Sequence, residues 1–400
     1  MKPTALIHGR VVLPHRVIED GAVLIDQGRI ATVAATENIT DICMGWQQID
    51  VEKRLITPGL MDIHIHGARG HTFNEPTLAA YSTITEENAR RGITSLLATT
   101  ATDSIENLAE CLAFTEEWMS AGHPYAQILG SHVEGPYFSL AQCGAQDPAH
   151  IRNPDDGSVE QLLPFAAIIR LLTLAPELPG ATALIQRLHA LGVKPAAGHS
   201  DATEDQLIAA IDAGLTHMIH IWSGQSSTVR EGPWRKPGLL ETTLTYDTLT
   251  AEMIADNRHL PPTLMKLAYK CLGPDRLCII SDATSGAGLS EGMRYQMGGM
   301  TYEVHNGVGM LLDRTAFAGS TTLLNAMLPV LIDVVGVPLV EAVRMATLTP
   351  ARIIGVDGIK GSLQVGKDAD IAIYDDDFNT WGVLIGGRWV VDPVQETDSK

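Results

Sequence analysis

The chain has 400 residues, 45% of them hydrophobic, and is long enough to bury one large core or one large and one small. Its formal net charge of −19 excludes a predominantly basic surface, so we expect no nucleic-acid partner. No apolar run is long enough to span a membrane, and the first residues lack the apolar segment of a signal peptide. Five cysteines without a CxxC pair are typical of reduced thiols, and we expect a cytoplasmic protein with no membrane association.

Both ends of the chain are predicted to form short β-strands. Residues 4–54 and residues 369–391 alternate apolar and polar side chains between glycines and aspartates, which is typical of strands rather than helices. We therefore predict one small β-sandwich domain that is assembled from residues 1–55 and 363–400. This arrangement brings the two termini near each other.

Between these ends, residues 56–362 alternate predicted strands with predicted helices. Several of the strands are nearly continuous apolar runs, which is typical of parallel strands covered on both faces. The predicted strands are residues 60–66, 93–99, 127–134, 169–174, 194–199, 215–221, 251–255 and 277–282. This α/β pattern favours a (β/α)8 barrel of the TIM type, which typically takes about 250 residues. An open doubly wound sheet is the alternative, but no G-x-G-x-x-G motif follows an early strand.

Histidines and carboxylates gather at the C-terminal ends of the predicted strands, where barrel enzymes carry their chemistry. His64 and His66 lie two positions apart at the end of the first strand, so their side chains share one face. The later strand ends contribute Glu134, Glu177, His199, His217, His259 and Asp282. Burying several imidazoles and carboxylates together is costly without a counter-ion, so we predict a divalent metal centre.

The predicted donors are imidazoles and carboxylates without cysteine. This set suits Zn²⁺, Fe²⁺, Mn²⁺ or Co²⁺, and the residues alone leave the choice open, with Zn²⁺ as the first expectation. Such an ion lowers the pKa of bound water and polarises a carbonyl oxygen. A carboxylate that is not a ligand must then carry a proton to the leaving nitrogen, and Asp282 at the last strand end is the candidate.

Specific motifs recur along nearly the whole chain. They include Pro58-Gly-Leu-Met-Asp-Ile-His-Ile-His-Gly, His132-Val-Glu-Gly-Pro-Tyr, Gly198-His-Ser-Asp-Ala-Thr, Ser281-Asp-Ala-Thr and Gly366-Lys-Asp-Ala-Asp-Ile. Together these motifs resemble the amidohydrolase superfamily and, within it, the N-acetylglucosamine-6-phosphate deacetylase family. The Glu-Gly-Pro block at 134–136 and the Asp256-x-x-His259 spacing point to the deacetylase branch.

The resemblance implies a set of metal ligands. Glu134, His199 and His217 match the main ligands of the deacetylase branch. His64 and His66 match the ligands of a second ion, which Glu134 is able to bridge. We therefore expect one or two divalent ions.

The resemblance also implies catalytic and substrate-binding residues. Asp282 matches the catalytic acid/base, and His259 matches a substrate-binding histidine that helps to polarise the acetyl carbonyl. Arg235 matches an arginine that binds the sugar phosphate, in some members across a dimer, and its paired donors suit a phosphate. A homodimer is the family expectation.

Two segments depart from the family pattern, and both concern the substrate. Residues 143–146 read Cys-Gly-Ala-Gln where the family commonly has Lys-Gly-Ala-His, so Gln146 stands in place of a sugar-facing histidine. Residues 218–234 differ from the segment that contacts the sugar phosphate. In a regular strand His220 faces away from His217, so we expect it to pack or to face the substrate.

The leading hypothesis is a metal-dependent amide hydrolase that converts N-acetylglucosamine 6-phosphate to glucosamine 6-phosphate and acetate. The alternative is a related amidohydrolase for another N-acetyl sugar, another phosphate position or an N-acyl small molecule. A non-catalytic scaffold is disfavoured because the chemical residues are all present. A deaminase or cyclic-amide hydrolase is weakened because residues 171–177 contain no lysine of the kind often carboxylated in cyclic-amide hydrolases.

Overall fold

Eight parallel strands form the central sheet, and their order in the sheet follows their order in the chain. The computed structural model describes residues 2–39 and 43–393. The strands are β6 Leu60–Ile65, β9 Ile93–Thr100, β10 Gln127–Glu134, β11 Ile169–Leu174, β12 Lys194–Ala197, β13 His217–Met218, β16 Thr250–Ile254 and β17 Leu277–Ile280. Each coincides with a predicted strand, and the barrel class is confirmed.

The sheet curves until its first and last strands meet. The Asp282 N–H donates to the His64 carbonyl at 2.9 Å, and the Ser281 N–H donates to Oδ1 of Asp62 at 3.2 Å. These bonds join the end of β17 to β6, so the sheet is a nearly closed barrel and the open doubly wound alternative is wrong. The strands are buried on both faces, as their continuous apolar runs predict.

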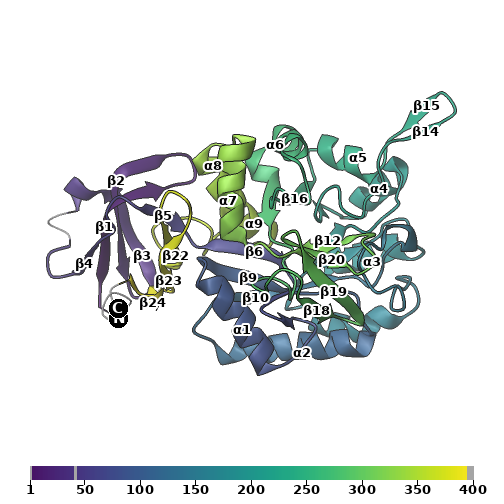
Figure 1. Cartoon of the computed structure of the whole chain (residues 1–400), viewed down its shortest axis with the longest axis horizontal. Coiled ribbons are helices and arrows are strands. Elements are labelled where there is room, and N and C mark those ends of the chain that lie inside the picture. Colours follow the sequence, from purple (N-terminus) through teal and green to yellow (C-terminus); the bar gives the residue numbers. More distant parts are fainter. Residues whose placement is uncertain (1, 40–42, 394–400) are drawn as a thin grey trace.

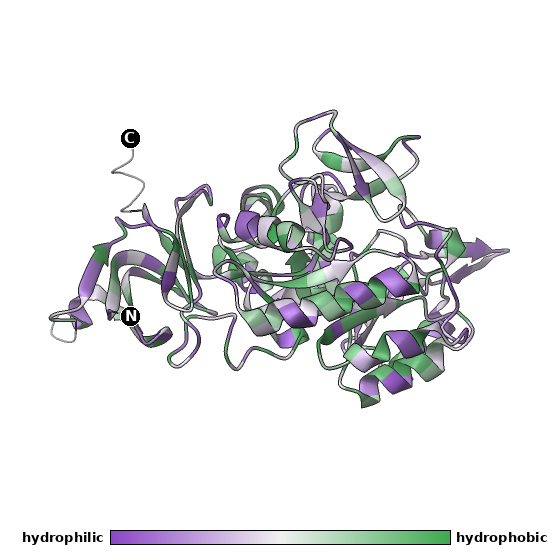
Figure 2. Ribbon diagram, turned by 90° about the horizontal axis from the view of Figure 1, so that it is seen from below, coloured by the Kyte–Doolittle hydropathy of each residue, from purple (hydrophilic) through white to green (hydrophobic). Residues whose placement is uncertain are grey.

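Helices cover the outside of the barrel (Figure 1). They are α1 Leu78–Ala89, α2 Ile105–Ala121, α3 Ala181–Ala190, α4 Glu204–Asp212, α5 Leu239–Thr245, α6 Pro262–Arg276, α7 Met327–Pro329, α8 Leu339–Met345 and α9 Leu348–Ile353. Hydrophilic and hydrophobic residues alternate along them (Figure 2), as expected of helices with one face on a core. α4 begins at a capping box in which Thr203 and Gln206 exchange hydrogen bonds. Among the described residues no helix is long and apolar enough to cross a membrane.

Strands from both ends of the chain form a second sheet beside the barrel (Figure 1). They are β1 Thr4–Val12, β2 Val17–Asp26, β3 Arg29–Ala35, β4 Gln47–Asp50, β5 Leu55–Pro58, β22 Ile371–Tyr374, β23 Thr380–Ile385 and β24 Arg388–Val391. β5 from the N-terminal part pairs antiparallel with β22, so the two ends share one sheet, as predicted. The exact division into a small β-domain of residues 1–55 and 363–400 and a barrel of residues 56–362 stays a prediction. Residues 1, 40–42 and 394–400 lie outside the described residues.

Three further β-structures were not predicted. The accessory sheet consists of β18 Arg294–Met297, β19 Met300–His305, β20 Val308–Leu311 and β21 Phe317–Ser320, and it follows the last barrel strand. β21 is attached to the barrel because the Ser320 N–H donates to the Asp282 carbonyl at 2.8 Å. A hairpin of β14 Val229–Glu231 and β15 Trp234–Lys236 projects from the molecule (Figure 1). The strands β7 Gly67–Ala68 and β8 His71–Thr72 form a small pair after β6.

Candidate active site

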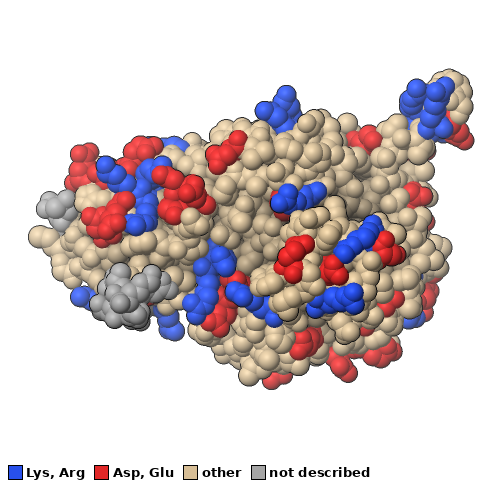
Figure 3. Space-filling view, in the orientation of Figure 1, with Lys and Arg blue, Asp and Glu red and all other residues tan. Residues whose placement is uncertain are grey.

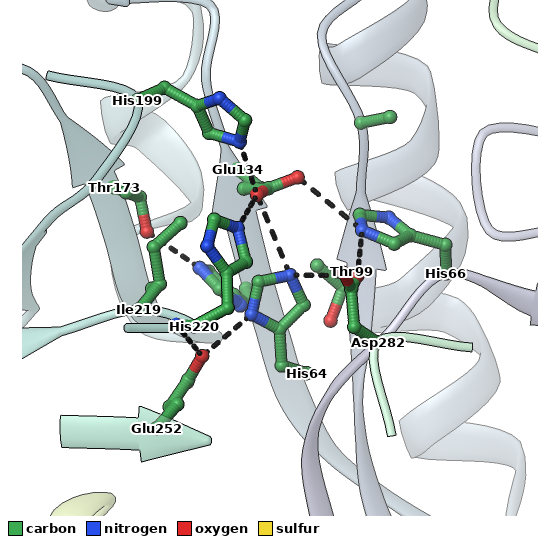
Figure 4. A network of polar contacts seen from close by, with 12 residues as sticks. His64, His66, Thr99, Glu134, Thr173, His199, Ile219, His220, Glu252 and Asp282 are labelled. Carbon is green, nitrogen blue, oxygen red and sulfur yellow. Dashed lines mark hydrogen bonds and ion pairs between the residues drawn. The ribbon is translucent and has the colours of Figure 1, made fainter. Parts of the chain in front are cut away.

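Six polar side chains converge at the C-terminal end of the barrel, around the carboxylate of Glu134 (Figure 4). They are His64 and His66 of β6 and the segment after it, Glu134 of β10, His199 after β12, His220 after β13 and Asp282 after β17. Nε2 of His220 is 3.0 Å from Oε1 of Glu134, and Nε2 of His199 is 3.3 Å from the same oxygen. Nε2 of His66 is 3.3 Å from Oε2 of Glu134 and 3.2 Å from Oδ1 of Asp282. All six residues are buried.

The backbone at two of these strand ends is unusual for residues with side chains. His199 and Asp282 have positive φ angles of 45° and 46°, in the left-handed region that disfavours a Cβ atom. Such conformations persist only where the surroundings enforce them, and they cluster at functional sites. Gly224 packs beside His199, where a Cβ atom would lie 2.8 Å from the ring Nδ1, so only glycine fits there.

Three of the imidazoles are oriented by an oxygen on the side of the ring that faces away from Glu134. Nδ1 of His64 is 2.7 Å from Oε2 of Glu252, Nδ1 of His199 is 2.9 Å from the Gln142 carbonyl, and Nδ1 of His220 is 3.2 Å from the Ser223 carbonyl. Because these oxygens accept, each Nδ1 has an acceptor for its N–H, and each Nε2 faces the cluster, as it must in a metal ligand. Among the described residues, Nε2 of His64 is buried and has no hydrogen-bond partner.

These donors fit a metal centre. The ligand atoms of His64, His66 and Glu134 lie within 4.8 Å of one another, and so do those of Glu134, His199 and His220. Glu134 belongs to both groups, and its two oxygens face different histidines. Neutral imidazole nitrogens around a shared carboxylate, without a thiolate, are a donor set that suits a divalent ion.

The carboxylates favour positive charge on the neighbouring imidazoles. Burial alone would lower the pKa of His66, but hydrogen bonds with Asp282 and Glu134 raise it to about 10. Burial alone would raise the pKa of Glu134, but the hydrogen bonds with His199 and His220 hold it well below its ordinary value. Protons or a divalent cation can supply the positive charge that these carboxylates demand, and metal binding releases the protons.

The structure corrects the predicted ligand His217, which it does not bring into the cluster. Nε2 of His217 is 3.1 Å from Oε1 of Glu252, and its Nδ1 is 2.8 Å from the Thr250 hydroxyl. Both ring nitrogens of His217 therefore contact partners outside the cluster around Glu134. His220, which we expected to pack or to face the substrate, lies in the cluster instead. β13 contains only two residues, so the alternation of a regular strand does not extend to position 220.

The cluster opens into a pocket that contains the other predicted residues except Arg235. It is lined by His66, Glu134, Gly144, Ala145, Gln146, His199, His220, Ser223, Gly224, His259, Asp282, Thr284, Met297 and residues 316–319. Nδ1 of His259 is held by Oδ2 of Asp256 at 2.7 Å. Gln146 donates to Oε2 of Glu134 at 2.6 Å and accepts from the Thr102 N–H at 2.8 Å. Arg235 is exposed on the projecting hairpin.

Some residues of the site were missed at the sequence level. Glu252 lies fully buried in β16 and contacts His64, and a lone carboxylate within the apolar run 251–255 was its signal in the sequence. His132 precedes Glu134 in β10 and packs edge-on against the His64 ring, with 4.5 Å between ring centroids. Glu177, at a predicted strand end, accepts from the Ser200 hydroxyl and does not line the pocket.

A parallel barrel with imidazoles and carboxylates at the C-terminal mouth of its strands defines the chain as a hydrolase of the TIM-barrel class. The chain belongs to the amidohydrolase family, whose model matches residues 55–390. It is therefore a hydrolytic enzyme that acts on an amide, and family membership implies a divalent metal.

Curated relatives and solved structures are similar over most of the chain. An N-acetylgalactosamine-6-phosphate deacetylase of Escherichia coli O157:H7 is 34% identical over 84% of this chain and 88% of its own length. An N-acetylglucosamine-6-phosphate deacetylase of Bacillus subtilis is 32% identical over 92% of each chain. The crystal structure of the N-acetylglucosamine-6-phosphate deacetylase of Pasteurella multocida has a TM-score of 0.90, with 28% identity over 97% of this chain and 99% of that one.

Substituting His220 tests the corrected ligand set. We expect His220→Asn to lose most of the bound metal, because it removes a nitrogen that points at Glu134, whereas His217→Asn should lose much less of it. Metal per chain, measured by mass spectrometry after gel filtration, checks this expectation. Circular dichroism of both variants controls for folding. Retention in His220→Asn together with loss in His217→Asn would restore the ligand set predicted from the sequence.

Proposed function

We propose that the chain removes the acetyl group from an N-acetylated amino sugar 6-phosphate, with N-acetylglucosamine 6-phosphate as the leading substrate. The observation that carries the proposal is the pocket in which Asp282 and His259 face the Glu134 cluster. Relatives named as deacetylases of such sugars, at 32–34% identity over most of the chain, support the same substrate class. The products are the free amino sugar phosphate and acetate.

We further propose that the site holds two divalent ions, with Zn²⁺ as the first expectation. Glu134, His199 and His220 would hold one, His64 and His66 would hold the other, and Glu134 would bridge them. When bound, such ions activate water and polarise a carbonyl oxygen. The orphaned Nε2 of His64 and the Nδ1 partners of three imidazoles support this arrangement.

The remaining groups of the pocket suit the proton transfers of amide hydrolysis. Asp282 reaches the cluster with Oδ1 and lines the pocket, so we propose that it accepts a proton from the attacking water and returns it to the leaving nitrogen. His259 is oriented by Asp256 and lines the same pocket, and we propose that it contacts the acetyl group of the substrate there. Gln146 holds the carboxylate of Glu134 in place.

The sugar phosphate needs a cation that the pocket of one chain does not provide. Among the residues that the structure describes, no lysine or arginine lines the pocket. Basic side chains lie along the projecting hairpin instead (Figure 3), where Arg235 follows Trp234, a residue 71% exposed. An isolated two-stranded hairpin is only marginally stable in water. We propose a homodimer in which Arg235 of one copy binds the phosphate in the pocket of the other.

N-acetylgalactosamine 6-phosphate is the second candidate substrate. The relative at 34% identity, from Escherichia coli O157:H7, is named for this sugar, and so is a relative from Shewanella at 29% identity. The two sugars carry the same acetamide and phosphate groups, so the chemistry proposed for Asp282 and His259 serves both.

We also propose that the enzyme acts in the cytoplasm. Cys111 and Cys278 are buried as free thiols, and Cys143 and Cys271 also form no disulfide among the described residues. Reduced thiols are typical of that compartment.

A substrate panel tests the proposed function. Purified, metal-loaded enzyme is given the 6-phosphates of N-acetylglucosamine and N-acetylgalactosamine, N-acetylglucosamine 1-phosphate and free N-acetylglucosamine, and the release of acetate is measured. We expect the highest kcat/KM for N-acetylglucosamine 6-phosphate. A preference for the galactosamine epimer would select the second candidate, and equal rates for the free sugar would contradict a phosphate-specific enzyme.

Replacing the proposed proton carrier should abolish turnover but spare metal binding. We expect Asp282→Asn to lower kcat by about 10²–10⁴-fold, because an amide cannot accept the proton. The matched control is Asp247→Asn, whose carboxylate is 95% exposed and pairs only with Arg276 among the described residues. Acetate release and metal content are measured on both. Near-normal turnover of Asp282→Asn would remove Asp282 from the mechanism.

The hairpin proposal predicts a defect that depends on the phosphate. We expect Arg235→Ala to raise KM for the 6-phosphate by about 10–100-fold, because the variant loses hydrogen bonds to a charged group. The kcat/KM for the free sugar should not change. Lys236→Ala is the control, because its side chain lies on the other face of the hairpin.

Mixed dimers test whether Arg235 acts across the dimer. One copy carries Arg235→Ala and the other carries Asp282→Asn, so a crossed arrangement leaves one complete site. At 6-phosphate concentrations well below the KM of the Arg235→Ala variant, we expect the mixture to be more active than either variant alone. Activity that does not recover on mixing, in a dimer verified by light scattering, would indicate that Arg235 acts within its own chain or not at all.

A further inference from the structure

Glu252 is a buried carboxylate directly beneath the site (Figure 4). It lies in the middle of β16 and is 0% exposed. Taking an ionised carboxylate out of water is costly unless several donors compensate it. Three donors reach this one. Nδ1 of His64 is 2.7 Å from Oε2, Nε2 of His217 is 3.1 Å from Oε1, and the His220 N–H lies 3.4 Å from Oε2.

The bond to Glu252 determines which nitrogen of His64 faces the site. A carboxylate accepts, so it holds the ring proton on Nδ1 and leaves the lone pair on Nε2. That Nε2 lies 3.6 Å from Glu134 and 3.6 Å from Asp282. Without the acceptor, the ring is free to adopt the other tautomer, which would point an N–H at the site in place of a lone pair.

His64 differs from the other oriented imidazoles in the kind of oxygen that holds it. The Nδ1 atoms of His199 and His220 bond to main-chain carbonyls, which the fold itself fixes. The Nδ1 atom of His64 bonds to a side chain. A substitution can therefore remove the support of His64 alone. His217, in turn, occupies the second oxygen of Glu252 and keeps that carboxylate directed at His64.

We propose that Glu252 is a positioning residue that makes His64 a metal ligand, and that His217 serves the site by holding Glu252. This inference rests on the two-ion arrangement proposed above. The proposal also explains why His217 is buried beside the site although neither of its ring nitrogens faces the cluster. The ion at His64 and His66 depends on Glu252, and the ion at His199 and His220 depends on it much less.

Calorimetric titration of the apoprotein with Zn²⁺ tests the proposal. We expect two binding events for the unmodified chain, and a His64→Asn, His66→Asn variant identifies the event that belongs to this pair. Glu252→Gln should weaken that same event by about 10–100-fold, the typical effect of removing the partner of a metal-bound histidine. The other event should keep its affinity.

Two variants separate positioning from folding. His132→Asn removes an imidazole that is also buried against the His64 ring but bonds to Thr173, so both events should remain. Glu252→Asp keeps the charge and draws it back by one methylene group, and we expect an intermediate loss at the same event. Tm values of the apoproteins show whether either change acts through stability, and Glu252→Asp decides the question if Glu252→Gln does not fold.

The outcomes distinguish this proposal from those on which it rests. Two events with unchanged affinities in a folded Glu252→Gln variant would overturn the role of Glu252 and leave the two-ion site intact. A single event in the unmodified chain would overturn the second ion and this inference together. The deacetylase proposal is decided separately, by the substrate panel.

Discussion

The carboxylate of Glu134 is the group around which the site is organised. Four imidazoles direct Nε2 towards it within 3.6 Å, and three of these rings, His64, His199 and His220, are held by an oxygen on their far side, which helps to offset the cost of burying the shared charge. That cost explains the second layer, which consists of Glu252, two main-chain carbonyls and a glycine that lets the chain pass close to His199. The left-handed backbone of His199 and Asp282 is a further cost of the same convergence.

Closing the barrel and assembling the site depend on the same few bonds. The His64 carbonyl and the Asp282 N–H join the last strand to the first, and both residues present their side chains to the cluster. Asp62 reinforces the joint by accepting from Ser281, and its burial raises the pKa of its carboxyl to about 7. A change that opened this joint would separate His64 from Asp282, so the geometry of the site and the closure of the fold cannot vary independently.

The sequence was sufficient for the parts of the molecule that repeat a simple period. Apolar runs gave the eight barrel strands, and polar residues at their ends gave five of the six clustered side chains in their proper places. It was insufficient where an element was too short for a period, as in β13, whose two residues led to the exchange of His217 and His220. Glu252 was missed because the sequence shows only a single carboxylate in an apolar strand. Its contact with His64 becomes visible only in the folded chain. The accessory sheet was missed because its short antiparallel strands do not follow the period of the barrel.

The attachment of the accessory sheet has a consequence for how such an enzyme diversifies. Ser320 bonds to the main chain of Asp282, and a Cβ atom on Gly319 would lie 2.5 Å from the Asp282 carbonyl, so the inner edge of this sheet tolerates little change. Met297 and Phe317 of the same sheet line the pocket with their side chains, and the Phe317 ring packs against His259, with 5.0 Å between ring centroids. The main chain of this sheet is thus constrained where it meets the barrel, while its side chains shape the pocket. Substitutions of these side chains would reshape the substrate pocket, while the backbone bonds of Asp282 to His64 and Ser320 would keep its carboxylate in place.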